Sequence, residues 1–64
     1  MTTLHECHVV VSLQYLCILW VGTNWHAAVE AAEEFGKYVT EIQIWIGSEH
    51  TNDYRNVQNE WTAI

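Results

Sequence analysis

The chain has 64 residues, of which 50% are hydrophobic and four are Trp, and eight carboxylates outnumber two basic side chains for a formal net charge of −6. Disordered acidic segments are poor in aromatic and β-branched residues, so this composition excludes a disordered tail and predicts one folded domain over residues 1–64. The scarcity of Lys and Arg argues against direct binding to nucleic acid or to anionic membranes, and an acidic surface selects for basic partners.

Cysteine usage and the apolar runs bear on the compartment. Cys7 and Cys17 are fewer cysteines than a secreted domain of this size usually carries. The first basic residue is Lys37, so no secretory signal peptide is expected. The longest apolar run, residues 9–21, is too short to cross a bilayer. We therefore expect an intracellular protein with reduced thiols.

Residues 4–21 predict two strands joined by a hairpin turn near Ser12–Gln14. Their β-branched and aromatic residues favour strands, and apolar side chains occupy every odd position from Cys7 to Val21, as on one face of a strand. A single strand of this length is too long for so small a domain, so a hairpin is expected. The turn itself carries no Gly, Asn or Asp, the residues that usually mark one. Part of the segment also fits a helical period. The second strand is apolar on both faces, which suits a central strand or a subunit interface.

The next segment predicts an amphipathic helix. Thr23 or Asn24 can cap its start, and Gly36 can end it. Its apolar stripe consists of Trp25, Ala28, Val29, Ala32, Phe35 and Gly36. Its polar face carries His26, Glu30, Glu33, Glu34 and Lys37. The alanines on the inner side allow this helix to approach a sheet closely.

Residues 39–46 alternate as a strand with one wet face, on which Trp45 lies among polar residues. A loop is expected over 47–52. The spacing of the apolar residues that follow favours a short C-terminal helix, with an edge strand as the alternative. The predicted fold class is α+β: a small antiparallel sheet of three or four strands, one helix on a face, and a C-terminal helix or edge strand (ββαβα or ββαββ).

Few residues indicate catalysis or metal binding. Cys17 lies in an apolar run where a thiol stays neutral, no nucleophile motif surrounds the serines, and no Gly-rich phosphate loop is present. An enzyme is therefore not expected, and no cofactor is predicted. The segment His5-Glu6-Cys7-His8 contains zinc-ligand types. In a strand, however, Glu6 and His8 share one face and His5 and Cys7 the other, so a metal-binding module remains an alternative only.

The acidic residues predict a partner-binding surface. Like charges on adjacent helical turns repel one another, and only Lys37 offsets them. Mixed signs suffice for solubility, whereas a surface of one sign steers a partner of opposite sign. The expected binding residues are Glu30, Glu33, Glu34, Glu41, Glu49 and Asp53, with Trp45 and Tyr54 as apolar anchors. Two alternatives stay open: the carboxylates serve solubility alone, and Trp45 is covered or packs across strands.

In size, in the Glu30, Glu33 and Glu34 face and in its hairpin–helix–strand order, the chain resembles phage-encoded anti-defence inhibitors, including anti-CRISPR proteins and anti-restriction DNA mimics. The resemblance implies an inhibitor in the bacterial cytoplasm. It would bind a host complex, such as a CRISPR surveillance complex, where nucleic acid binds, and no residue role is carried over. The alternative is a homo-oligomeric accessory domain that pairs through Leu16, Ile18 and Trp20, since a second subunit would cover apolar surface of so small a domain.

Overall fold

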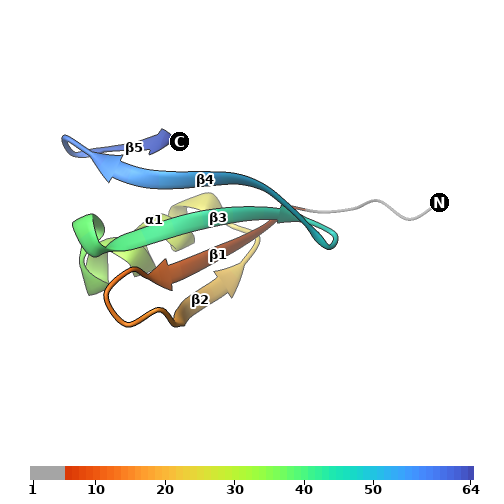
Figure 1. Ribbon diagram of the computed structural model, residues 1–64, viewed down its shortest axis with the longest axis horizontal. Helices are drawn as coiled ribbons and strands as arrows, with labels where there is room; N and C mark the ends of the chain where they lie inside the picture. Colours follow the sequence, from red (N-terminus) through yellow and green to blue (C-terminus); the bar gives the residue numbers. More distant parts are fainter. Residues whose placement is uncertain (1–5) are drawn as a thin grey trace.

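A computed structural model of the chain, which describes residues 6–64, has one helix on one face of a five-stranded antiparallel sheet (Figure 1). In chain order the elements are β1 (Glu6–Ser12), β2 (Ile18–Gly22), α1 (Trp25–Phe35), the 3-10 turn η1 (Lys37–Val39), β3 (Thr40–Ile46), β4 (Glu49–Val57) and β5 (Glu60–Ala63). The strand order is β2-β1-β3-β4-β5. The α+β class is confirmed.

The expected hairpin between β1 and β2 is present, and Ser12 organises its turn. The Ser12 N–H donates to the carbonyl of Cys17 at 2.8 Å, and the Ser12 carbonyl accepts from Leu16 N–H at 2.9 Å. The Ser12 hydroxyl also accepts from Tyr15 N–H at 2.9 Å. Leu16 adopts a φ of 55°, which non-glycine residues rarely do. A serine and one strained residue thus close a turn that lacks Gly, Asn and Asp.

The face of β1 that packs under the helix is not the face that its hydrophobic pattern indicates. Its even-numbered residues His8, Val10 and Ser12 are buried on the helix side, while the apolar odd-numbered residues face away from α1 and are only half-buried. The register explains this, because Val10 pairs with Ile42 of β3. The isoleucines of β3 lie on the face that packs against the helix. Residues paired across two strands share a face, so the even-numbered residues of β1 lie on that face as well.

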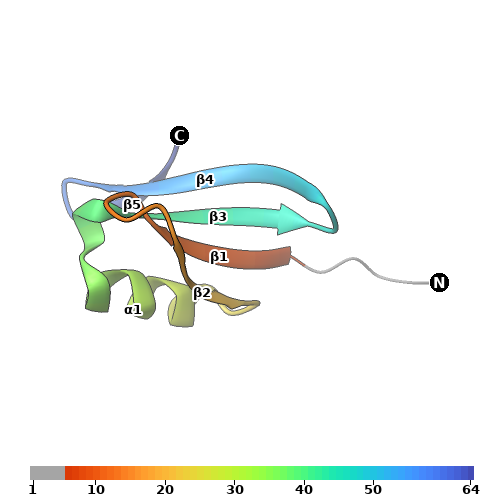
Figure 2. The ribbon, with the colours of Figure 1, turned by 60° about the horizontal axis from the view of Figure 1, so that its bottom comes forward.

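The helix was predicted closely. The Asn24 side chain caps α1 by accepting from Ala27 N–H at 3.0 Å, and Gly36 ends the helix with a φ of 151°. Ala28 and Ala32 are fully buried against the sheet. Figure 2 shows α1 along one face of the sheet, on the side of β1 and β2 and away from β4 and β5. The small alanines let the helix backbone come close to the strands, where Val10, Ile42 and Ile44 complete the core.

The C-terminal third differs from the prediction. The sheet has five strands, more than the three or four expected. The loop expected over 47–52 and the C-terminal segment, for which a helix was favoured over an edge strand, form the two strands β4 and β5. Gly47 turns the chain into β4 with a φ of 63°, and Gln58 and Asn59 have φ values of 52° and 68°. Two successive residues of positive φ make a tight hairpin connection and cannot continue a helix. Val57, at the end of β4, is exposed although it is apolar.

No helix within residues 6–64 has the length and apolar character needed to cross a membrane.

Candidate functional site

Three carboxylates form a group on the outer side of α1. Glu30, Glu33 and Glu34 are all exposed. They project from the helix opposite the buried alanines, because three- and four-residue spacing returns a side chain to the same helical face. We call these three residues the helix carboxylates.

Both basic side chains of the protein are engaged away from the helix carboxylates. Lys37 Nζ donates to Asn59 Oδ1 at 2.6 Å, and the Tyr38 hydroxyl donates to the same oxygen at 2.7 Å. Arg55 Nε donates to Glu41 Oε1 at 3.0 Å. The expected compensation of the helix carboxylates by Lys37 is absent, because α1 ends at Phe35 and Lys37 begins η1. Neither Lys nor Arg therefore neighbours this group among the described residues.

The other three acidic residues expected at the surface lie elsewhere. Glu41 is only 7% exposed, on the sheet face opposite α1. Asp53 lies half-buried on the same face of β4, where its carboxylate contacts the His50 imidazole. Glu49 is exposed at the start of β4, beside the turn that follows β3. The structure thus divides the six predicted residues between two faces and an edge, and it brings together only the helix carboxylates.

Contacts along β3 and across to β4 hold Glu41 and Trp45 in place. Gln43 Nε2 donates to Glu41 Oε2 at 3.1 Å, and Trp45 Nε1 donates to Gln43 Oε1 at 3.1 Å. The Trp45 ring also stacks on His50, with centroids 4.8 Å apart and planes inclined by 11°. Trp45 therefore packs across strands, which was the alternative to an exposed anchor. A row of hydrogen-bonded and stacked side chains runs along β3 and β4 on the face without a helix.

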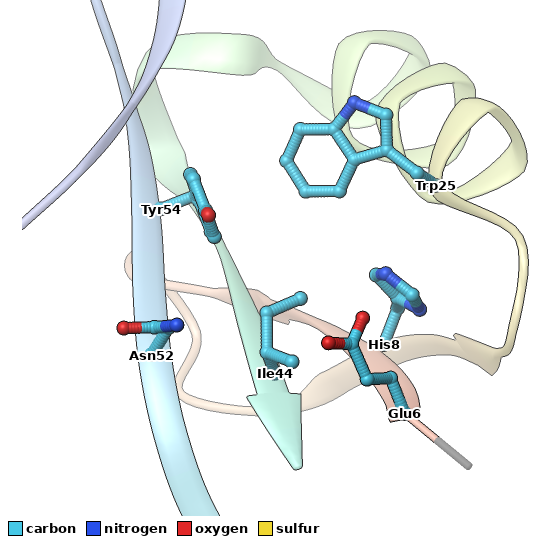
Figure 3. Close-up of a pocket in the computed structure, with 6 residues that line it drawn as sticks. All are labelled: Glu6, His8, Trp25, Ile44, Asn52 and Tyr54. Atoms are coloured by element: carbon cyan, nitrogen blue, oxygen red, sulfur yellow. The ribbon is translucent and has the colours of Figure 1, made fainter. Parts of the chain in front are cut away.

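Tyr54, the second expected anchor, points to the opposite face, where it packs on the helix. Its ring meets Trp25 edge-on, at 5.0 Å between centroids and 65° between planes. Tyr54 lines a pocket of about 280 Å³ together with Glu6, His8, Trp25, Ile44 and Asn52. Figure 3 shows Tyr54 and Asn52 of β4 facing Trp25, His8 and Glu6 across this space, with Ile44 between them. We call it the α1–β4 pocket.

The α1–β4 pocket exists because α1 covers only part of the sheet. The helix packs on β1, β2 and β3, while β4 lies beyond the part of the sheet that the helix covers. Trp25, the first residue of α1, overhangs His8 with ring centroids 5.9 Å apart. Residues from three strands and the helix therefore converge on one recess. Strand alternation predicts that Glu6 and His8 share one face. Asn52 lies in the segment expected as a loop and Tyr54 in the segment expected as a helix, so the sequence did not predict the pocket.

The metal-ligand types near the start of the chain do not gather. Glu6 and His8 lie on the helix side of β1 while Cys7 points to the other face, as strand alternation predicts. His5 lies outside the described residues. Within residues 6–64, no group of three His, Cys, Asp or Glu side chains is arranged to hold a metal ion.

Comparison of the chain with protein-family models, with curated proteins and with solved structures gave no match.

Proposed function

We propose that this chain is a non-enzymatic binding protein that inhibits a nucleic-acid-binding complex of bacterial defence, in the manner of anti-CRISPR proteins and DNA mimics. The helix carboxylates would occupy a Lys/Arg-rich site on that complex in the cytoplasm of the host cell. The observation that supports the proposal is the exposure of Glu30, Glu33 and Glu34 with both basic side chains bonded elsewhere. No cofactor is needed for this role.

The spacing of the carboxylates supports mimicry of a phosphate backbone. Side chains three and four residues apart on a helix lie about 5–6 Å from one another. DNA carries one phosphate per about 3.4 Å of helix axis on each strand. A groove lined with Lys and Arg for DNA would therefore meet a similar density of negative charge on α1. Like charges on adjacent turns cost stability, and a gain in partner binding offsets that cost.

Charge reversal tests the proposal with a matched control. The variant E30K/E33K changes two helix carboxylates, and E49K/E60K makes the same change in net charge at exposed positions of β4 and β5. Binding to CRISPR surveillance complexes and restriction enzymes would be measured by biolayer interferometry at low and high salt, with and without target DNA. We expect E30K/E33K alone to abolish binding, and we expect DNA and salt to compete with the unmodified chain.

Binding that is insensitive to DNA and to salt would overturn the mimicry. Equal loss in both double variants would show that net charge matters and that the helix carboxylates have no special role. Circular dichroism of each variant separates loss of binding from loss of fold.

A second candidate function is self-association, because the hairpin turn and β2 expose apolar side chains. Leu16 is 85% exposed and Ile18 is 65% exposed. β2 is also an edge strand, and its sequence ILWVG carries none of the charges that usually protect an edge. Trp20, expected on the same surface, is half-buried and packs against the core. Light scattering over a range of concentrations tests this candidate, and a strictly monomeric mass excludes it.

A further inference from the structure

The α1–β4 pocket contains a buried polar side chain without a partner. His8 is only 7% exposed, yet its Nδ1 has no hydrogen-bond partner among the described residues. Burying a polar group without such a partner is costly, so buried polar groups are usually satisfied by protein, water or ligand. A neutral imidazole offers one acceptor nitrogen and one N–H donor. His8 therefore places a polar ring with one unsatisfied, buried nitrogen in the wall of a pocket, and a rotation of that ring would turn the nitrogen toward a bound group.

The other walls of the pocket favour a cation. Glu6, from the start of β1, is the one charged side chain among the residues that line it. The rings of Trp25 and Tyr54 form an aromatic corner in the same pocket. Aromatic faces attract cations, and a carboxylate adds a charge-assisted hydrogen bond. The net charge of −6 further raises the local concentration of cations.

Among organic cations, the guanidinium group fits these walls best. It is planar, it stacks on aromatic rings, and it is hydrated more weakly than an ammonium group. Its several N–H donors can reach a carboxylate and a neighbouring acceptor at the same time. The pocket volume of about 280 Å³ is near the lower end for ligand sites, which suits one side chain better than a larger molecule.

We propose that the α1–β4 pocket receives the guanidinium group of an arginine side chain presented by the basic partner. Glu6 binds the charge, and Trp25 and Tyr54 contact the plane of the group. After a rotation of its ring, His8 accepts a hydrogen bond from one of the N–H groups. The source of the arginine rests on the proposed function, whereas the chemistry of the pocket does not. The helix carboxylates then supply long-range attraction, and the pocket supplies a specific contact.

Titration with a small arginine derivative tests the pocket directly. The probe is Nα-acetyl-arginine methylamide, followed by the backbone amide signals and the Trp25 indole N–H of the ¹⁵N-labelled chain. The matched control is the citrulline derivative, which has the same shape without the charge. We expect saturable shifts centred on Glu6, His8, Trp25 and Tyr54, and affinity about tenfold weaker for citrulline. Equal affinity for the two probes, or shifts confined to the helix carboxylates, would overturn the proposal.

Two variants refine the test. E6Q should weaken binding of the arginine derivative about tenfold, because it removes a charge-assisted hydrogen bond. E60Q removes the same charge from exposed β5 and should leave the affinity within about twofold. H8F keeps a ring in the wall and should lower the affinity several-fold. If H8F fails to fold, the comparison of E6Q with E60Q still decides.

The outcomes separate this proposal from the proposed function. Arginine binding that depends on Glu6, with no affinity for any defence complex, supports the pocket and redirects the search to another basic partner. Binding of a defence complex that depends on Glu30 and Glu33 but is equal for E6Q and E60Q overturns the assignment of the arginine to that partner and leaves the proposed function standing.

Discussion

The Glu41 carboxylate, nearly buried on the sheet face that lacks a helix, accepts a hydrogen bond from the side chain of Arg55 on the neighbouring strand. The two residues are paired across β3 and β4. This pair fixes the single arginine of the protein and removes one carboxylate from the acidic surface.

Arg55→Met should lower the free energy of unfolding by about 1–3 kcal/mol, because it leaves a buried carboxylate without its charged partner. The double variant E41Q/R55M should lose less than the sum of the two single variants, since the second change removes the uncompensated charge. Urea denaturation followed by tryptophan fluorescence measures both. Strictly additive losses would show that the pair contributes little.

The contact between Trp20 and Gly22 gives a second prediction. A Cβ atom on Gly22 would overlap the indole ring of Trp20. Gly22→Ala should therefore destabilise the protein by about 1–3 kcal/mol, because the ring must leave its place against the core. Ser48→Ala, at an exposed turn, is the control and should change stability by less than about 0.5 kcal/mol. A change in the near-ultraviolet circular dichroism should accompany the loss in Gly22→Ala.

The turn between β4 and β5 supports a third prediction. Asn59 has a positive φ, and its side-chain oxygen accepts from both Lys37 and Tyr38. Asn59→Ala should cost about 1–2 kcal/mol, since it removes the acceptor and places a less tolerant residue in the left-handed region. Asn59→Asp keeps the acceptor and the conformational tolerance, so its unfolding midpoint should equal or exceed that of the parent chain. Similar losses in both variants would contradict this explanation.

Leu16 provides a prediction of increased stability. It is highly exposed and has a positive φ, so Leu16→Gly relieves strain without loss of packing. We expect a gain of about 0.5–1 kcal/mol, the strain relieved less the backbone entropy that glycine loses. Gln14→Gly, at an exposed turn residue without a positive φ, should instead lower the unfolding temperature. A lower stability of Leu16→Gly would show that the side chain makes stabilising contacts.

Local sequence determined what could be predicted of the fold. The helix follows from its own residues, because the apolar stripe, Asn24 and Gly36 all lie within one short segment. The β4–β5 hairpin does not, because its turn uses Gln58 and Asn59 in place of the usual glycine. The spacing from Tyr54 to Ile64 fits a helix as well as a strand pair. Only the pairing with β3 decides between them.

The site was predictable to the extent that its residues share one element. The helix carboxylates were expected together and lie together. Glu41 was separated from them by strand register, which places it beside Arg55. The α1–β4 pocket needs three strands and the start of the helix, so no local pattern reveals it. Tertiary contacts alone bring Glu6 and Tyr54 to the same recess.

The strand order β2-β1-β3-β4-β5 has a consequence for folding kinetics. β3, β4 and β5 are consecutive in the chain and pair as local hairpins, whereas β1 reaches β3 only after β2 and α1 have intervened. Hairpins between neighbouring strands form within about 1–10 μs, and pairings that close longer loops form later. The pairing of β1 with β3, in which Val10 lies opposite Ile42, is therefore expected to set the height of the folding barrier. A truncation of either side chain should slow refolding more than a change at the β4–β5 turn.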